Sequence, residues 1–499
     1  MFASKMIVLL LSLLCFGAAE GAKILGVFPI ASPSHYILGS ALLKGLAEAG
    51  HNVTMISPYS QKAPPKNGTW REIVLEELAE EMKKRFENPN LFQKRPSGPL
   101  FFFFFLNNNR NAEQVLAHPK VQNLIHSGEK FDVVIVLQFF NDAMKAFASH
   151  FGGHLVLFSN TAPNSMLNPL VGNPSLPSHS PEVMMGYAGR MTFYQRLLNS
   201  IFKFATALNL NTLFYYRQNK LIQKYFPNPV DIADVLYNAS LVLVNSHVSF
   251  SDAEPTVPCM MICKNFLDDA KEGVIYFSLG SNLKSKNLPE EKRDALLKAF
   301  HKRKEKVLWK WEEDVMPGQP SNVKLGKWFP QQEILAHPNV KVFITHGGML
   351  STTETVHHGV PIIAIPIFAD QAMNARTAEE AGIGVVLPFD DLSEETLSSL
   401  LEEVINNPKY RENVKQRSTI MQDRQVKPMD KAIYWIEYVI RHNGALHLRV
   451  PYLHLTWYQY YLLDVFGFIL LFALTAFVIT KVICTHLCSR TRTRKEKTN

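Results

Sequence analysis

Short apolar runs alternate with longer amphipathic segments through the first half of the chain. The runs have the length of buried strands, and the segments that follow them read as helices. The elements predicted by this pattern are a strand over 24–30, a helix from about Tyr36 to Ala49, strands over Val53–Ser57 and Phe131–Leu137, a helix from about Asn141, and a strand over His154–Ser159. Strands that alternate with helices are typical of a parallel α/β sheet.

A second alternation of the same kind begins near Gly273, after a break between about 250 and 272. Its predicted elements are strands over 274–280, 307–311, 340–345 and 361–368, and helices over 289–301, 371–381, 393–405 and 408–421, with one further helix that begins near Ser351. Two such halves predict two Rossmann-like domains. The cleft between them is where we expect the active site.

Both ends of the chain resemble targeting segments. Lys5, the apolar run Met6–Phe16 and the small residues 17–19 predict a secretory signal, which is too short to span a bilayer. Near the other end, Val465–Thr480 contains no charged residue, and aromatic residues precede it as an interfacial belt would. We therefore expect a transmembrane helix over 460–484, with a buried core helix as the alternative.

The residues that follow this apolar segment are basic. Positively charged residues stay on the cytosolic side, so the body of the protein is expected in the lumen. Lys495 and Lys497 resemble the dilysine retrieval signal of endoplasmic reticulum membrane proteins, and a plain basic tail is the alternative. Glycosylation sequons at Asn52, Asn67 and Asn238 fit a luminal body.

Composition changes this picture little. The net charge is +8, and because much of that surplus lies in the last ten residues, it gives little support to nucleic-acid binding. Five cysteines exclude a disulfide scaffold, and no Cys/His spacing suggests a zinc site. The run Phe101–Phe105 either packs in a core or lines an apolar acceptor pocket.

Candidate chemistry gathers where the predicted strand 340–345 runs into His346-Gly347-Gly348. Glycines let a backbone come close to a ligand, and the start of the next helix presents free N–H groups that suit phosphate. The following apolar strand ends at Asp370-Gln371. Two strand ends thus deliver polar side chains to one edge of a parallel sheet, which predicts a nucleotide or phosphate ligand there.

The residues from Trp328 to Gln371 form a more specific pattern, which reads W-x-P-Q, H-G-G, S-x-x-E and D-Q. It closely resembles the donor-binding motif of the UDP-glycosyltransferases, in their microsomal animal form and most like the insect members, and the resemblance covers nearly the whole chain. It implies a glycosyltransferase B fold, with two Rossmann-like domains that face a cleft, and a C-terminal transmembrane helix. It also implies that residues 425–450 cross back to the first domain. The residues that carry the pattern are Trp328, Pro330, Gln331, His346, Gly347, Gly348, Ser351, Glu354, Asp370 and Gln371.

The resemblance assigns the donor contacts residue by residue. Trp328 is expected to stack on uracil, although it could also be a core residue, and Gln331 is expected to touch the base or ribose. Glu354 would bond the ribose hydroxyls, and Asp370 and Gln371 the sugar hydroxyls. The diphosphate would be surrounded by Ser278, Gly280, Ser281, His346 and Ser351, next to Gly347 and Gly348. The co-substrate would be UDP-glucose or another UDP-sugar, with no cofactor and no catalytic metal.

His35 is the candidate general base. It follows the first predicted strand directly and precedes a helix, which places it at the carboxyl edge of the sheet. The family has an Asp behind this His at the end of the strand 131–137, where this chain has Leu137. Asp142 is the nearest carboxylate downstream and is the candidate partner of His35. It could equally be an acid at the start of a helix.

Two further positions depart from the family. The interdomain linker is short, because Cys263 runs almost directly into the stretch that begins at Phe266. Asn245 stands where vertebrate glucuronosyl members carry an Arg, so a glucuronate group would lose an expected partner.

These observations predict an inverting glycosyltransferase that moves a hexose, with glucose favoured, from a UDP-sugar to a hydroxyl group of a small lipophilic acceptor. A UDP-glucuronosyltransferase and a non-catalytic protein that binds UDP-sugar or lipophile are the alternatives. We expect a membrane-anchored protein with no nucleic-acid partner, and the sequence is compatible with a homo-oligomer.

The predicted segments are a signal peptide (1–22), an acceptor-binding domain (23–250), a linker (251–272), a UDP-sugar-binding domain (273–425), a return and juxtamembrane segment (426–459), a transmembrane helix (460–484) and a basic cytosolic tail (485–499).

Overall fold

The computed structural model describes most of the chain. The described residues are 21–61, 63–87, 109–246, 260–262, 274–450, 453, 455–460 and 462–496. They belong to two compact units, Met1–Arg449 and Val450–Asn499. The run Phe101–Phe105, nearly all of the predicted signal peptide and most of the predicted linker lie outside the described residues.

The first domain is built on a parallel sheet. Within the described residues this sheet has seven strands in the order β3-β2-β1-β4-β5-β6-β7. Its strands are β1 (Lys23–Val27), β2 (Asn52–Ser57), β3 (Thr69–Val74), β4 (Val133–Leu137), β5 (His154–Ser159), β6 (Ala239–Val244) and β7 (Met260–Ile262). The strand β4 reads VVIVL and is buried at every position, as expected for a central parallel strand that is covered on both faces.

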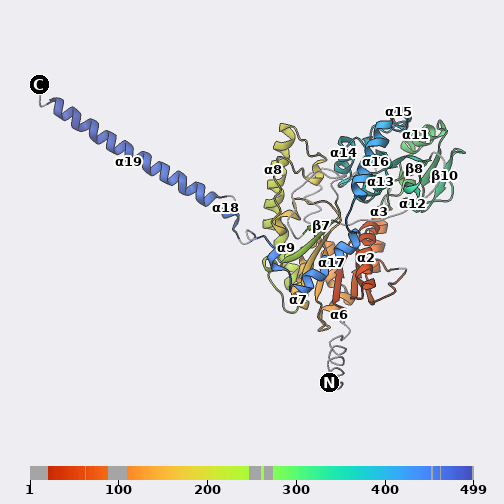
Figure 1. Cartoon of the computed structure of the whole chain (residues 1–499), viewed down its shortest axis with the longest axis horizontal. Helices are drawn as coiled ribbons and strands as arrows, with labels where there is room; N and C mark the ends of the chain where they lie inside the picture. The colour runs from red at the N-terminus through yellow and green to blue at the C-terminus, as the bar shows by residue number, and fades with distance from the viewer. Residues whose placement is uncertain are drawn as a thin grey trace, which may run out of the picture. The chain divides into compact units, whose positions relative to one another are not determined.

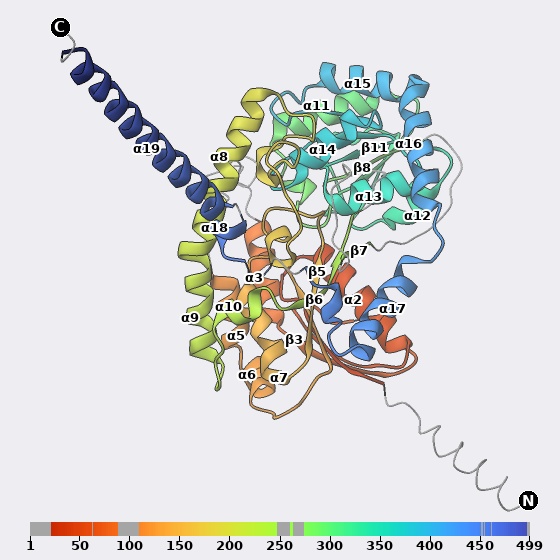
Figure 2. The same cartoon turned by 60° about the vertical axis from the view of Figure 1, so that its left-hand side comes forward.

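Helices and short helical turns connect these strands. They are α2 (Pro33–Glu48), α3 (Glu76–Phe86), α5 (Arg110–Ala117), α6 (Pro119–Ile125), η2 (Asp142–Lys145), α7 (Ala146–Phe151), η3 (Asn168–Val171), η4 (Val183–Met185), α8 (Phe193–Asn209), η5 (Leu210–Phe214), α9 (Tyr215–Tyr225) and α10 (Ile232–Leu236). The connection between β5 and β6 is the longest of the described ones, and it contains α8, α9 and α10, which run along one side of the domain (Figure 2).

The second domain repeats the plan. In the described part of the chain its parallel sheet has six strands in the order β10-β9-β8-β11-β12-β13. The strands are β8 (Val274–Ser278), β9 (Lys306–Lys310), β10 (Val323–Gly326), β11 (Val340–Thr345), β12 (Ile362–Ala364) and β13 (Gly384–Val386). The helices are η6 (Ser285–Asn287), α11 (Glu290–His301), α12 (Gln331–Ala336), α13 (Met349–His358), α14 (Gln371–Glu380), α15 (Glu394–Asn406) and α16 (Pro408–Gln422). Figure 1 shows the two domains within the first unit.

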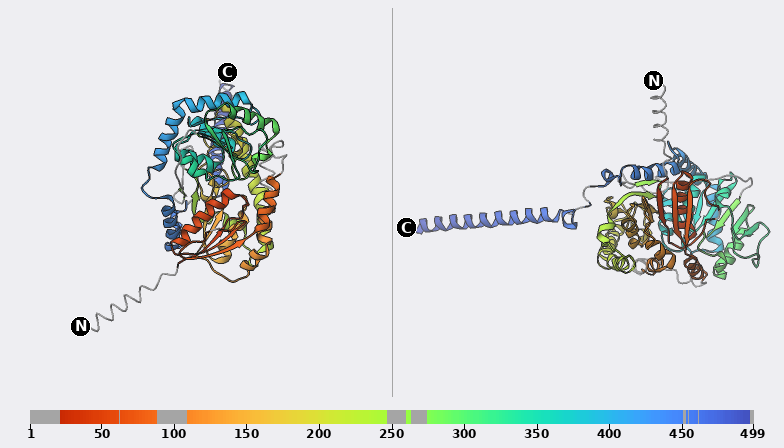
Figure 3. Two further views of the ribbon diagram at one scale, coloured as in Figure 1. Left: turned by 90° about the vertical axis from the view of Figure 1, so that its right-hand side faces the viewer. Right: turned by 90° about the horizontal axis from the view of Figure 1, so that it is seen from below.

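Helix α17 (Pro428–Arg441) returns to the first domain, as the family resemblance implied. Its residues Ala432, Ile436 and Val439 are fully buried in the same core cluster as residues of β1 and β4. The helix also packs on α2, and the two lie side by side in Figure 3 (left). The chain is thus tied back to its first half after it has completed the second sheet, and η7 (Leu446–Leu448) ends this unit.

The second unit contains the helices α18 (Trp457–Tyr460) and α19 (Leu463–Glu496). In α19 the segment Leu463–Thr485 is 23 residues long, has a mean hydropathy of 2.4, and is not buried against protein. It is long and apolar enough to cross a membrane.

The boundaries differ from the sequence-based expectations at a few places. The strand predicted over 361–368 is only the three-residue β12, because Pro361 and Pro366 cannot donate ladder hydrogen bonds. The helix expected from Asn141 begins as the single turn η2 and ends at Gly152, which has a φ of +75°. Three residues of the predicted linker form β7, which extends the first sheet.

Candidate active site

His35 lies in the first turn of α2, just beyond the carboxyl end of β1. Its Nδ1 atom is 3.4 Å from the Ser34 hydroxyl, and its Nε2 atom is 2.8 Å from the side-chain nitrogen of Asn160. The ring meets Phe139 edge-on, with 5.0 Å between ring centroids. Burial lowers the pKa of His35 to about 4, so the imidazole is neutral near pH 7 and can accept a proton.

Asn160 is a site residue that the sequence reasoning missed. It follows the end of β5, which pairs with β4, so the strand next to the one that ends at Leu137 supplies the side chain that meets His35. Its Oδ1 atom is buried without a hydrogen-bond partner among the described residues. An amide can turn about its last torsion, so it can either donate to Nε2 or accept from it. A search for polar residues at the ends of neighbouring strands would have pointed to Asn160.

The structure does not bring Asp142 to His35. The Asp142 carboxylate pairs with Lys145 and accepts a hydrogen bond of 3.1 Å from Gln138. Lys145 is fully buried and Asp142 nearly so, and a buried ammonium group needs such a partner. The predicted partnership between Asp142 and His35 is therefore corrected, since Asp142 neutralises Lys145. Leu137, at the position of the family Asp, is a core residue.

In the second domain, the ends of three strands lie in register. Thr345 of β11 pairs with Ser278 of β8 on one side and with Ala364 of β12 on the other. The residues predicted to bind the diphosphate and the sugar lie at these ends or within the next seven residues. The parallel arrangement thus collects them at one edge of the sheet, as expected for a ligand site in an α/β fold.

The His346 ring is held between two glycine backbones. A Cβ atom at Gly280 would lie 2.6 Å from Cε1 of this ring, and one at Gly348 would lie 2.5 Å from Nε2. Gly280 and Gly347 have φ values of +82° and +78°, which favour glycine. Burial, followed by the nearby Lys310, lowers the pKa of His346 to about 4. The His346 ring is therefore neutral near pH 7.

Gly348 is also the residue before the first turn of α13, and no side chain caps that end of the helix. The first N–H groups of a helix point outward and carry the positive end of the helix dipole. His346, Gly348 and the start of α13 together form a concentrated set of donors for an anionic group. Ser281, which follows Gly280, lies half-buried in the loop after β8.

Gln331, Ser351 and Glu354 form one hydrogen-bonded cluster. The side-chain nitrogen of Gln331 donates to Glu354 at 2.6 Å and to the Ser351 hydroxyl at 3.1 Å, while Tyr276 donates to Gln331 Oε1 at 3.2 Å. Gln332 donates to the second oxygen of Glu354 at 2.9 Å. Residues that are 20 to 55 positions apart in the sequence thus orient one another, as the predicted ribose site requires.

Asn374 connects the glycine turn to the predicted sugar site. Its side-chain nitrogen donates to the Gly347 carbonyl at 3.0 Å and to Asp370 Oδ2 at 2.7 Å. Burial raises the pKa of Asp370 above its ordinary value. Gln371 accepts hydrogen bonds from the backbone N–H groups of Ile367 and Phe368, so its oxygen shapes the loop and its Nε2 group is the part that could donate to a ligand.

Trp328 is 66% exposed, so the alternative that it is a core residue is wrong. The Lys310 ammonium lies 5.9 Å from the centre of its ring. A large aromatic face that is open to solvent beside the Gln331 helix is suited to stacking on a flat base.

The carboxyl edges of the two sheets meet within the first unit. The Asn282 side chain, in the loop after β8, donates to the Ser32 hydroxyl at 3.1 Å. Ser32 is the residue before α2, and His35 is in the first turn of that helix. The predicted base and the predicted diphosphate loop are therefore brought together by strands from different domains.

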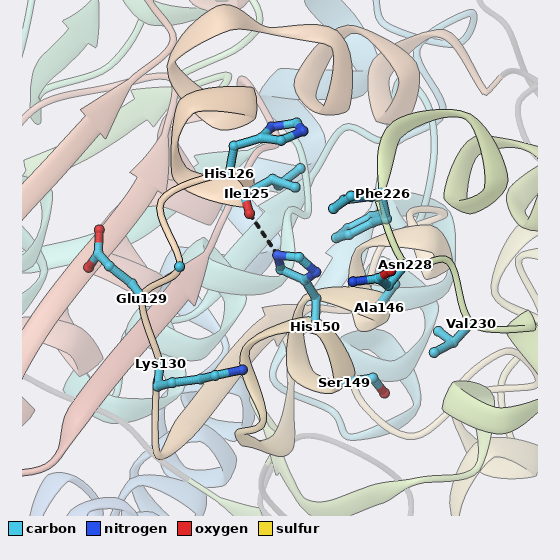
Figure 4. Close-up of a pocket in the computed structure, with 12 residues that line it drawn as sticks. Ile125, His126, Glu129, Lys130, Ala146, Ser149, His150, Phe226, Asn228 and Val230 are labelled. Carbon is cyan, nitrogen blue, oxygen red and sulfur yellow. Dashed lines mark hydrogen bonds between the residues drawn. The ribbon is translucent and has the colours of Figure 1, made fainter.

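A separate cavity of about 540 Å³ lies elsewhere in the first domain. Figure 4 shows His126, His150 and Lys130 around it, with Phe226 and Asn228 on the other side. His150 bonds the Ile125 carbonyl at 2.7 Å. The lining residues come from the segments that precede β4, β5 and β6, so the cavity lies at the opposite edge of the sheet from His35.

The sequence and the fold match known glycosyltransferases. A family model described as "UDP-glucoronosyl and UDP-glucosyl transferase" matches residues 22–498. The chain is 36% identical to "UDP-glycosyltransferase UGT5" of Dactylopius coccus over 94% of this chain and 93% of that protein. It is 34% identical to "UDP-glucosyltransferase 2" of the same organism over 99% of each. The crystal structure of the calicheamicin glycosyltransferase CalG4 has a TM-score of 0.55 and 18% identity, over 85% of this chain and 99% of that chain, which confirms the glycosyltransferase B fold.

The contact between Asn160 and His35 generates a testable prediction. Asn160→Asp should raise the pKa of His35 above its value of about 4, because a carboxylate next to the ring favours the imidazolium form. Diethyl pyrocarbonate modifies neutral imidazoles, so the modification of the His35 peptide, followed by mass spectrometry from pH 4 to pH 7, reports this pKa. The variant should lose reactivity at a higher pH than the wild type. His346 in the same samples is the internal control, and an unchanged His35 profile would contradict the contact.

Proposed function

Because the chain belongs to the family of UDP-glucuronosyl and UDP-glucosyl transferases, we propose that it moves a hexose, preferably glucose, from UDP to a hydroxyl group of a small lipophilic acceptor. The observation that carries this proposal is the meeting of the two sheet edges through Ser32 and Asn282. This meeting brings the neutral His35 near a loop that is rich in hydrogen-bond donors for an anion. A non-catalytic binding protein would have no need of that histidine.

The second domain would hold the donor. Uracil would stack on Trp328, and the ribose hydroxyls would bond Glu354, which Gln331 and Gln332 already orient. The diphosphate would accept hydrogen bonds from the start of α13 and from His346. An anion at that place also raises the pKa of the neutral His346, so the ring becomes a better donor as the leaving group gains charge.

His35 would act as the general base. It takes the proton of the acceptor hydroxyl while the oxygen attacks the anomeric carbon, and the bond from that carbon to the UDP oxygen breaks with inversion. If the side-chain amide of Asn160 is turned so that its oxygen accepts from Nε2–H of His35, the Nδ1 lone pair of His35 is left to take the proton. The same carbonyl would then stabilise the imidazolium, which is the role that the family gives to an Asp.

The sugar site favours a neutral hexose. Asp370 and Gln371 offer groups that can bond hydroxyls, and burial already disfavours the charged form of Asp370. Asn245 is buried at the end of β6, where its side chain donates to the backbone carbonyl of Asn160 at 3.4 Å. A glucuronate carboxylate would need a cation there, and an Asn offers only neutral donors.

The apolar segment Leu463–Thr485 supports anchoring in a membrane. We propose the endoplasmic reticulum membrane, with the tail in the cytosol and the catalytic body in the lumen. The basic residues after the segment, and Lys495 and Lys497 near the chain end, support this orientation. The sequon residues Asn67 and Asn238 are exposed, as glycosylation requires.

The role of His35 is tested by His35→Ala. Loss of a general base typically costs about a hundredfold to ten-thousandfold in turnover, whereas UDP binding should stay within about twofold because the donor contacts lie in the other domain. Transfer is measured by mass spectrometry, and UDP binding by calorimetry on the purified full chain. His301→Ala, at the end of α11, is the matched control. Turnover above about a tenth of the wild type would remove His35 from this role.

Donor preference is a separate prediction. The purified enzyme should use UDP-glucose with a specificity constant at least about tenfold above that for UDP-glucuronate, equivalent to about 1.4 kcal/mol. Both donors are tested with one acceptor. The binding of each donor is measured by its competition with UDP, which separates poor binding from slow chemistry. Equal use of the two donors, or a preference for the glucuronate, would favour the glucuronosyltransferase alternative.

A further inference from the structure

The cavity of about 540 Å³ in the first domain is formed where three segments meet. Its lining comes from residues 125–130 at and after the end of α6, from 146–150 in α7, and from 226–230 after α9. Small-molecule sites have volumes of about 300–1,000 Å³. We call this space the α7 cavity. The five-residue strand β4, which is about 16 Å long, separates it from the edge of the sheet where His35 lies.

One wall of the α7 cavity is apolar and held in place. Ile125, Ala146 and Phe226 belong to it, with exposed fractions of 2%, 1% and 5%. The Phe226 ring meets the rings of Phe147 and His150 edge-on, at centroid distances of 5.2 Å and 5.5 Å. Because these contacts fix the orientation of the ring, the wall is suited to a flat apolar group.

The same wall carries a hydrogen-bonding atom that no described residue uses. The His150 Nε2 atom lies 2.7 Å from the Ile125 carbonyl, and since a carbonyl can only accept, Nε2 carries the hydrogen. Nδ1 of the neutral ring is then an acceptor. This atom has no hydrogen-bond partner among the described residues, and in Figure 4 it lies on the side of Asn228.

Lys130 brings a positive charge to the α7 cavity. Its ammonium group has no ion-pair or hydrogen-bond partner in the described part of the chain. In Figure 4 its side chain extends toward Ser149 and His150, whereas Glu129 points the other way. The Glu129 carboxylate accepts two hydrogen bonds from Arg71, at 2.9 Å and 2.8 Å, and is therefore not the partner of Lys130.

The other acidic residues next to the lining segments are also engaged. Asp132 accepts from the Lys23 N–H group at 2.7 Å. Asp231 accepts from the Ala233 N–H group at 2.8 Å and from the Asn219 side chain at 3.1 Å. A hydrated lysine by itself indicates no ligand, but this one stands beside a preformed apolar wall and an unused imidazole nitrogen.

We propose that the α7 cavity binds a small aromatic carboxylate. The ring of the ligand packs on Ile125 and Phe226, and its carboxylate bonds the Lys130 ammonium. A donor group on the ring can bond Nδ1 of His150. A purely apolar ligand would leave the Lys130 charge unused, and an inorganic anion would leave the apolar wall unused, so an aromatic acid matches more of the lining than either. The inference concerns a second binding site and does not depend on the transferase activity.

The proposal is tested by photolabelling of the full chain in detergent micelles with saturating UDP. The probe is 4-benzoylbenzoate, a photoreactive aromatic carboxylate, and its uncharged analogue 4-methylbenzophenone is used at the same free concentration. Labelled peptides are mapped by mass spectrometry, with 2-naphthoate and inorganic phosphate as competitors. Lys130→Met removes the charge, and Ser149→Trp fills part of the cavity. Lys304→Met, at an exposed lysine of the second domain, is the matched control.

The labels of 4-benzoylbenzoate should fall in residues 125–130, 146–150 and 226–230, and 2-naphthoate should displace them. Lys130→Met should lower these labels at least about fivefold, and so should the uncharged probe, because each removes the charge-assisted hydrogen bond. Ser149→Trp should also lower them, whereas Lys304→Met should not. An unchanged thermal unfolding midpoint of the body in each variant separates loss of the site from loss of the fold.

Three results would overturn the proposal. Equal labelling by the two probes would show an apolar cavity without selection for an acid. Displacement by phosphate as effective as by 2-naphthoate would show a patch that attracts any anion. Labels confined to the surroundings of His35, or labels in the three segments that Lys130→Met leaves unchanged, would show that the carboxylate does not bind in the α7 cavity.

Discussion

The site depends on a meeting of two parallel sheets at their carboxyl edges. The side chains of Asn282 and Ser32 join the loops that follow β1 and β8, at 3.1 Å from the Asn282 nitrogen and 3.4 Å from its oxygen to the Ser32 hydroxyl. A hydrogen bond of this kind contributes only about 1 kcal/mol. The geometry must therefore be supported by packing. Helix α17 provides part of this support, because Ile436 and its neighbours are buried in the core of the first domain after the chain has left the second. The return segment thus restricts how far the two edges can separate.

Burial then determines the charge state of the site. His35 and His346 are both held neutral by desolvation, and the pKa of Asp370 is raised by the same cause. In the proposed function, the second domain would present neutral donors, glycine backbones and a helix start to a ligand that brings its own negative charge. The first domain would present a neutral imidazole to a hydroxyl group. Each group can thus respond to charge that arrives with the substrate or develops during transfer.

The sequence predicted the fold and most of the site because the signals were local. The strands β5 and β11 match their predicted bounds, since continuous apolar runs end at clear polar boundaries. The partner of His35 could not be found in the same way. Asp142 is the nearest carboxylate downstream in the sequence, but its carboxylate pairs with Lys145 one helical turn later. Asn160 becomes visible only when β4 and β5 are known to be neighbours, which is a property of the sheet order.

The central claim is that a UDP-sugar spans the two sheet edges with its anomeric carbon toward His35. The most direct measurement is an experimental structure of the chain with a UDP-hexose analogue that cannot be transferred. The account predicts uracil on Trp328, the diphosphate at Gly348 and the start of α13, and the anomeric carbon on the side of His35 and Asn160. A nucleotide bound at the opposite edge of the first sheet, or a sugar that points away from His35, would contradict it.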